Sequence, residues 1–194
     1  MATIDQLKQD IVFSARLRGH EFTLHSTWGI FSPKAIDEGT QLLIDQLSVD
    51  KPNVDCLDIG CGYGPLALVL AKLAPHGTVH AVDKDFMAVQ YTAKNAQLNS
   101  LSNVRAYLSN GLAQVPASQQ FDVIVSNVPA KIGSELLSIM LHDAHAQLRP
   151  GGKLYVVTIS GLKDYMKRNL TEVFGNYDKL KQSRTYTAAV AVKR

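Results

Sequence analysis

Apolar residues recur along this chain in two alternating patterns. From residue 54 onward, short apolar runs that suit buried strands alternate with longer stretches in which apolar residues recur at helical spacing. The predicted strands cover residues 54–59, 78–82, 104–108, 121–126, 153–159, about 176–182 and 185–192. The predicted helices between them cover residues 65–73, 86–98, 134–148 and 162–174. This alternation predicts an α/β fold in which helices cover both faces of a mostly parallel sheet.

The order of these elements also predicts where a ligand binds. The last two strands are separated too briefly for a crossover helix, so we expect them to form an antiparallel hairpin. Ligands of open parallel sheets bind beyond the carboxyl ends of the strands, where the strand order reverses. We therefore look for chemistry at the strand ends.

The residues before position 54 predict a smaller extension. Apolar side chains at helical spacing predict a helix over 4–15, loose alternation predicts a short strand over 21–26, and a second helix is expected over 35–48. We therefore expect one domain over residues 1–194, with an extension over 1–50 and the core over 51–194.

The composition narrows the class of protein. Hydrophobic residues make up 46% of the chain, which argues against disorder. The start of the chain lacks the features of a signal peptide, and no apolar stretch approaches the ~20 residues that a membrane span needs. The only two cysteines, Cys56 and Cys61, give no disulfide framework. A soluble cytoplasmic protein is the simplest interpretation.

Positive charge is concentrated near the C-terminus. The chain carries a net charge of +3, and residues 161–194 hold eight Lys or Arg against three Asp or Glu. A basic surface of this kind can meet phosphate groups. An ordinary solvated surface is the simpler interpretation of the charge alone.

A glycine-rich turn follows the first strand of the core. The segment Asp58–Gly64 has the spacing D-x-G-x-G-x-G and is followed by Pro65. A dinucleotide fingerprint would need a glycine at position 65, and its pyrophosphate needs free N–H groups at the helix start, one of which Pro65 removes. S-adenosylmethionine has no phosphate, and Asp58 can meet its amino group directly or through water. The turn therefore favours S-adenosylmethionine, with Gly60, Cys61, Gly62 and Gly64 beside it.

Polar residues at the next two strand ends extend this prediction. Asp83, which Lys84 follows, ends the second strand, where a carboxylate can accept both ribose hydroxyls. The simpler role for such an Asp is a helix cap, but Asp85 is the better cap for the following helix. Asn110 and Gly111 end the third strand and can approach the adenine, although a plain Asn-Gly turn explains them equally well.

These residues carry a resemblance to a known family. Residues 54–193 resemble the class I, Rossmann-like S-adenosylmethionine-dependent methyltransferases. Within them the chain is similar to the "methyltransferase small domain" group, which includes ribosomal RNA guanine-N2 methyltransferases and single-domain archaeal relatives. Residues 26–32 and 37–40 resemble that group's segment before the first core strand. The resemblance implies a seven-stranded sheet of order 3-2-1-4-5-7-6 and an N-terminal segment that covers the cofactor.

The segment after the fourth strand holds the expected chemistry. It reads Asn127-Val128-Pro129-Ala130, where amino-group methyltransferases usually have Asn-Pro-Pro-aromatic. In those enzymes the Asn oxygen and the carbonyl of the next residue accept hydrogen bonds from the target amino group. The resemblance therefore implies catalytic roles for Asn127, Val128 and Pro129, and places Asn127 next to the cofactor as well.

Two departures from that pattern affect the expected substrate. Val128 still offers a carbonyl, and Pro129 still favours an extended conformation for it. Ala130 removes a ring that could stack on a base, a contact of roughly 1–3 kcal/mol. Lys131 can meet a phosphate or another acidic group, or can be a solvated surface lysine. Trp28 and Phe31 can form a lid or a stacking platform, or can pack in the core.

We therefore expect an N-methyltransferase that acts on a nucleobase amino group in RNA. The family resemblance makes guanine N2 the expected target. The alternatives are a methyltransferase for a small molecule or protein side chain, a cofactor-binding protein without catalysis, and an NAD(P) oxidoreductase, which Pro65 disfavours. We expect no metal, because His142 and His145 lack a third ligand. We expect no membrane partner, and the sequence leaves room for a homo-oligomer.

Overall fold

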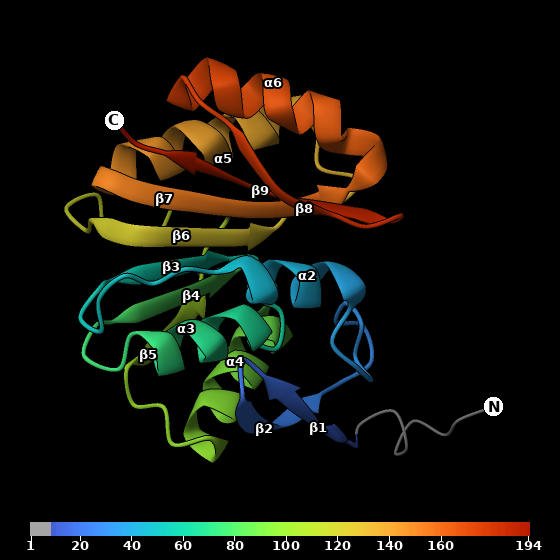
Figure 1. Cartoon of the computed structure of the whole chain (residues 1–194). Helices are drawn as coiled ribbons and strands as arrows, with labels where there is room; N and C mark the ends of the chain where they lie inside the picture. Colours follow the sequence, from blue (N-terminus) through green and yellow to red (C-terminus); the bar gives the residue numbers. More distant parts are fainter. Residues whose placement is uncertain (1–8) are drawn as a thin grey trace.

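The computed structural model describes residues 9–194 and contains a seven-stranded sheet of order β5-β4-β3-β6-β7-β9-β8 (Figure 1). The strands are β3 (Cys56–Ile59), β4 (Val79–Asp83), β5 (Val104–Leu108), β6 (Phe121–Asn127), β7 (Leu148–Ile159), β8 (Asp178–Gln182) and β9 (Tyr186–Val192). β9 pairs antiparallel with both β7 and β8, and the other strands run parallel. The predicted strand order and the C-terminal hairpin are confirmed.

Helices cover both faces of the sheet, as predicted. They are α2 (Glu38–Gln46), α3 (Pro65–Leu73), α4 (Phe86–Leu98), α5 (Ser134–Gln147) and α6 (Lys163–Phe174), the last preceded by a short 3-10 turn over Ser160–Leu162. α3, α4 and β5 have the predicted bounds. α2 is shorter than the predicted helix, because Asp37 caps its first turn and the chain becomes extended at Leu47.

The predicted helix over 4–15 is wrong where it can be checked. Residues 4–8 lie outside the described part, and Ile11–Leu17 form β1, which pairs antiparallel with β2 (His20–Ser26). Side chains along β1 alternate between exposed and more buried positions, which is a strand period. The intervening Arg18 and Gly19 both have positive φ, as a tight hairpin turn requires. The turn and the alternation override the weaker helical spacing.

Side-chain amides attach this hairpin to α4. The Asn95 amide accepts from the backbone N–H of His25 and donates to its carbonyl, both at 2.8 Å. The Asn99 amide makes the same pair of bonds with Thr23, at 3.0 and 2.8 Å. Two asparagines one helical turn apart thus pair with the edge of β2 as a neighbouring strand would, and this fixes the chain just before the Trp28–Phe31 segment.

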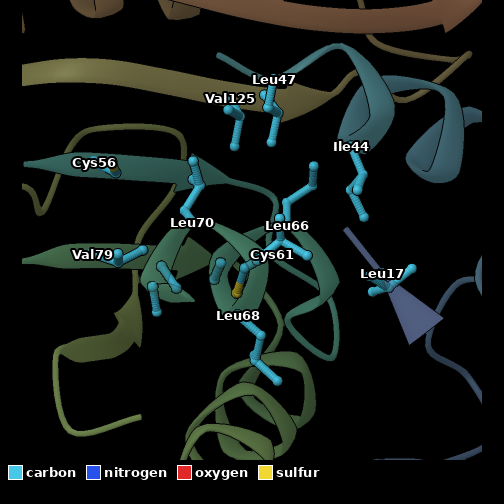
Figure 2. Packing of buried hydrophobic residues seen from close by; sticks show 14 of the residues in the cluster. Leu17, Ile44, Leu47, Cys56, Cys61, Leu66, Leu68, Leu70, Val79 and Val125 are labelled. Carbon is cyan, nitrogen blue, oxygen red and sulfur yellow. The ribbon is translucent and has the colours of Figure 1, made fainter. Parts of the chain in front are cut away.

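The core has two parts, one on each face of the sheet. α2, α3, α4 and the hairpin pack on one face, and α5 and α6 pack on the other (Figure 1). Figure 2 shows Leu66 and Leu70 of α3 in one cluster with Ile44 of α2 and with Leu47, which follows that helix. α3 is buried almost throughout, so the turn that precedes it rests on a rigid support. Within residues 9–194, every helix is too short or too polar to cross a membrane.

Candidate active site

A cavity of about 850 Å³ lies at the carboxyl ends of the strands. Twelve of the fifteen site residues predicted from the sequence line this cavity. Those twelve are Phe31, Gly60, Cys61, Gly62, Asp83, Lys84, Asn110, Gly111, Asn127, Val128, Pro129 and Lys131. The other three, Trp28, Asp58 and Gly64, do not line it. The expected cofactor and acceptor residues therefore share one cavity.

The glycine-rich turn is held in place by hydrogen bonds to its backbone. The Gly62 N–H donates to Asp83 Oδ2 at 3.0 Å, and the Gly62 carbonyl accepts from the Thr92 hydroxyl at 2.9 Å. The Tyr63 carbonyl accepts from the Asn95 amide at 2.8 Å. Thr92 and Asn95 are fully buried, so α4 fixes the turn from behind and leaves its front to the cavity.

The glycines of the turn fall into two classes. A Cβ on Gly60 would meet no heavy atom within 4 Å, and one on Gly62 only Ile30 at 4.0 Å, although both residues line the cavity. These two positions keep the cavity open to a ligand that approaches the backbone closely. Gly64 has a φ of +99°, and a Cβ there would lie 2.7 Å from Leu68 and 3.0 Å from Thr92. Gly64 therefore serves the packing of the turn, whereas Gly60 and Gly62 serve the cavity and fit the expected cofactor.

Asp58 lies behind the turn. Its side chain is fully buried, its Oδ2 accepts from the Ala67 N–H of α3 at 3.0 Å, and its Oδ1 has no hydrogen-bond partner among residues 9–194. Burial, together with the negative charge of Asp83, raises the pKa of Asp58 from 3.8 to about 8. Asp58 links the turn to the first turn of α3, and its contact with the cofactor amino group stays a prediction.

Asp83, the last residue of β4, and Asp85, which follows the strand, have separate roles. Asp85 caps α4 by accepting from the Met87 N–H at 2.8 Å, as expected. Asp83 accepts from the Gly62 N–H and, through Oδ1, from the Asp85 N–H at 3.0 Å, and it lines the cavity. Asp83 thus joins the glycine turn to the end of β4 and keeps a carboxylate at the cavity wall, where the ribose is expected.

The end of β5 forms a compact turn. The Ser109 hydroxyl donates to the Gly111 carbonyl at 2.7 Å, and the Asn110 N–H donates to Gln114 Oε1 at 2.8 Å. Asn110 is exposed and lines the cavity. Asn110 and Gly111 therefore form a turn and also line the cavity. Their contact with the adenine stays a prediction.

Asn127 ends β6 at the cavity and bonds to the start of α2. Its Nδ2 lies 3.0 Å from Thr40 Oγ1 and 3.3 and 3.4 Å from the two carboxylate oxygens of Asp37. Asp37 Oδ2 also accepts from the Thr40 N–H at 3.1 Å, which caps α2. Both partners line the cavity. A residue of the fourth core strand and a helix cap 90 positions earlier thus form one side of the site.

The residues after Asn127 run along the cavity wall. Val128 is buried, and its N–H donates to the Val157 carbonyl at 2.9 Å, which continues the pairing of β6 with β7. Pro129, Ala130 and Lys131 are exposed and line the cavity. The wall therefore changes from a buried strand end to an open rim within four residues.

Phe31 and Trp28 are both exposed, with 66% and 47% of their surface accessible. The suggestion that they pack in the core is wrong, because a core residue would be almost fully covered. Phe31 lines the cavity, whereas the Trp28 ring lies 4.7 Å from the Lys34 ammonium, outside the cavity lining. Of these two residues, Phe31 is the one that offers its ring to a molecule in the cavity.

Cys61 and Lys84 also lie where expected. Cys61 is buried at the cavity wall, and burial raises the pKa of its thiol well above the usual range. A neutral thiol is a poor nucleophile, which agrees with its interpretation as a small residue of the turn. Lys84 is exposed at the rim.

The sequence did not nominate several residues of the cavity. Asp37, Thr40 and Tyr186 line it, although Tyr186 belongs to the last strand. A Cβ on Gly39 would lie 2.7 Å from the Tyr186 ring, so the ring covers this glycine closely. The segment Asp37–Thr40 had carried part of the family resemblance, and that was the signal that could have identified it.

Known proteins resemble both the sequence and the structure. A family model described as "Methyltransferase small domain" matches residues 21–189. The uncharacterized protein YbxB of Bacillus subtilis is 37% identical over 75% of this chain and 72% of its own length. The ribosomal RNA small subunit methyltransferase C of Shewanella halifaxensis is 32% identical over 89% of this chain and 50% of its own length.

A solved structure gives the same result. The 16S rRNA N2 G1207 methyltransferase (RsmC) of T. thermophilus, in complex with AdoMet and guanosine, superposes with a TM-score of 0.85 at 32% identity. The match covers 94% of this chain and 50% of the other, so the chain spans about half the length of the ribosomal RNA methyltransferases it resembles. The chain belongs to the methyltransferase small domain family of S-adenosylmethionine-dependent methyltransferases.

Proposed function

We propose that this chain methylates an exocyclic amino group of a nucleobase in RNA, with guanine N2 as the first candidate. The observation that carries the proposal is the position of Asn127 at the end of β6, in the same cavity as Gly60, Gly62 and Asp83. The relative of 32% identity whose structure holds AdoMet and guanosine supports a purine as the acceptor. The match to ribosomal RNA methyltransferases supports RNA.

The residues divide into two groups by expected task. The glycine turn faces the amino-acid end of the cofactor, Asp83 the ribose, and Asn110 with Gly111 the adenine. S-adenosylmethionine supplies an electrophilic methyl group. Asn127 Oδ1 and the Val128 carbonyl accept the two N–H groups of the acceptor, which aims the nitrogen lone pair at the methyl carbon. As the new C–N bond forms, the C–S bond breaks, and the methylated nitrogen then loses a proton to water.

The acceptor base needs a surface to lie against. Ala130 offers no ring, but Phe31 lines the cavity and is exposed. We assign base stacking to Phe31, an interaction of roughly 1–3 kcal/mol. Trp28, which lies outside the cavity lining, would reach only parts of the RNA beyond the target base.

Basic side chains support RNA as the partner. Lys131 is exposed at the cavity rim. Tyr186 begins β9 and lines the cavity, so the preceding β8–β9 turn, with exposed Arg184, lies at the same edge of the sheet. Lysine and arginine at this edge would contact phosphates on either side of the target base.

A second candidate is methylation of a small molecule or a protein side chain. Val128 and Ala130 favour it, because both depart from the Asn-Pro-Pro-aromatic pattern of base methylation. Restoring that pattern with Val128→Pro and Ala130→Phe separates the two candidates. The double variant should keep or raise activity on RNA if the acceptor is a base, whereas the added ring should obstruct a different acceptor.

The experiment that tests the proposal is tritiated methyl transfer from S-adenosylmethionine into total RNA, total protein and a metabolite extract, side by side. We expect label in RNA, released as a methylated guanosine after digestion to nucleosides. Asn127→Ala is the matched control and should remove that label. Label confined to protein or metabolites would overturn the proposal in favour of the second candidate.

A further inference from the structure

The amide of Asn127 is oriented by its neighbours. Its Nδ2 faces both carboxylate oxygens of Asp37 at 3.3 and 3.4 Å and Thr40 Oγ1 at 3.0 Å. A carboxylate only accepts hydrogen bonds, so the donor end of the amide must face Asp37 and the acceptor end must face away. Without such neighbours, the two ends of an asparagine amide could exchange places by rotation about the last side-chain bond.

We propose that Asp37 and Thr40 are positioning residues that hold the Asn127 amide with its oxygen toward the acceptor amino group. The inference rests on the proposed function, because the orientation matters only if Asn127 receives an N–H. With the amide reversed, its NH2 would face the NH2 of the acceptor, and two donors cannot pair. The Asp37–Thr40 pair thus selects the only rotamer of Asn127 that can orient an amino group.

The charge of Asp37 adds to this effect. A carboxylate bonded to the amide NH2 polarises the amide and makes its oxygen a stronger acceptor. Methyl transfer also places positive charge on the acceptor nitrogen, and a fixed negative charge behind Asn127 stabilises it. Asp37 acts through Asn127 and does not touch the acceptor.

The fold limits where the Asp37 carboxylate can go. Its Oδ2 accepts from the Thr40 N–H at 3.1 Å, and a Cβ on Gly39 would lie only 3.0 Å from that oxygen and 2.7 Å from the Tyr186 ring. Thr40 is buried. The negative charge of Asp37 contributes to the raised pKa of Tyr186. The half-buried carboxylate therefore lies between the start of α2, Asn127 and the Tyr186 ring.

A simpler role for Asp37 is to cap α2, and substitutions separate the two roles. Asn and Ser cap helices as well as Asp does. An Asn at position 37 has one acceptor oxygen, so if it caps through that oxygen, its own NH2 faces the NH2 of Asn127. Asp37→Asn and Asp37→Ser should therefore keep the thermal stability of the protein but lower kcat at least tenfold on RNA.

The controls separate catalysis from binding and from general charge. S-adenosylhomocysteine affinity should change less than twofold in both variants, because the residues expected to bind the cofactor are the glycine turn, Asp83, Asn110 and Gly111. The Asn127 amide donates to Asp37 and Thr40, so Glu38→Gln, which removes a neighbouring exposed carboxylate outside this set, should leave kcat unchanged. Thr40→Val should lower kcat several-fold, and Thr40→Ser, which keeps the hydroxyl, should restore it.

A double variant tests whether Asp37 acts through Asn127. Combined with Asn127→Ala, Asp37→Asn should cause no further loss, because the group it positions is gone. Full activity of a folded Asp37→Asn or Asp37→Ser enzyme, beside an inactive Asn127→Ala enzyme, would overturn this inference alone. Full activity of Asn127→Ala would overturn the proposed function. If neither Asp37 variant folds, equal activity of Thr40→Val and Thr40→Ser decides against the inference.

Discussion

The two halves of the cavity are built differently. On the cofactor side, the glycine turn is fixed by hydrogen bonds from Thr92, Asn95 and Asp83, and two of these three side chains are fully buried. On the acceptor side, Phe31, Pro129, Ala130 and Lys131 are exposed, and the ordered contact is that of Asn127 with Asp37 and Thr40. A rigid half faces an open half.

This difference fits two different tasks. The same cofactor binds in every turnover, so a preformed backbone surface suits it, because few protein groups then need to become ordered when it binds. An acceptor that belongs to a larger molecule needs an open rim and a few oriented groups. The following predictions test the contrast between the halves.

The largest expected effect concerns Gly64, inside the rigid half. Gly64→Ala forces a Cβ to within 2.7 Å of Leu68 at a φ of +99°, and should lower the free energy of unfolding by roughly 2–5 kcal/mol. Gly60→Ala is the matched control, because it also has positive φ but meets no atom within 4 Å. It should cost about 1–2 kcal/mol. Urea unfolding measures both, and equal losses would remove the distinction between the two glycines.

The next prediction concerns the pH dependence of stability and Asp58. The pKa of its carboxyl is about 8 in the folded protein, above the ordinary 3.8. The folded state therefore holds this proton more tightly than the unfolded state, and the free energy of unfolding falls as pH rises between those values. Relative to Asp58→Asn, the wild type without cofactor should lose roughly 2–3 kcal/mol from pH 5 to 7. A pH-independent difference between the two proteins would contradict the burial argument.

Asp83 connects the rigid half to the cofactor. Asp83→Ala should weaken S-adenosylhomocysteine binding by about 1–3 kcal/mol, because ribose hydroxyls and the Gly62 N–H lose their acceptor. Asp85 also lines the cavity but uses its carboxylate to cap α4, so Asp85→Ala should cost about 1 kcal/mol of stability and leave the affinity nearly unchanged. If calorimetry shows that Asp85→Ala binds S-adenosylhomocysteine more weakly than Asp83→Ala does, Asp85 rather than Asp83 contacts the ribose.

The smallest expected effect lies in the open half. Phe31→Ala should raise KM for RNA about tenfold, the equivalent of about 1.4 kcal/mol of stacking, and leave cofactor affinity unchanged. Trp28→Ala should raise KM less, because Trp28 does not line the cavity. An unchanged KM in Phe31→Ala would contradict the assignment of base stacking to Phe31.

The same contrast explains what the sequence could predict. The glycine turn and Asp83 could be predicted from local spacing, because each lies directly at the end of an apolar strand, whereas the strand order came from the family resemblance. Asp37 and Tyr186 reach the site only through tertiary packing, from opposite ends of the chain. The strand Ile11–Leu17 was missed because its apolar residues also fit a helical period, and the turn at Arg18-Gly19 together with the alternating burial decides for the strand.

The most direct test of the central claim is the single-turnover rate of methyl transfer to RNA by Asn127→Ala. If Asn127 orients an amino group, the rate should fall at least tenfold, a loss of more than about 1.4 kcal/mol of transition-state stabilisation. S-adenosylhomocysteine affinity, measured by calorimetry on the same preparation, should change much less. A fully active Asn127→Ala enzyme would contradict the claim and indicate an acceptor that needs no such orientation.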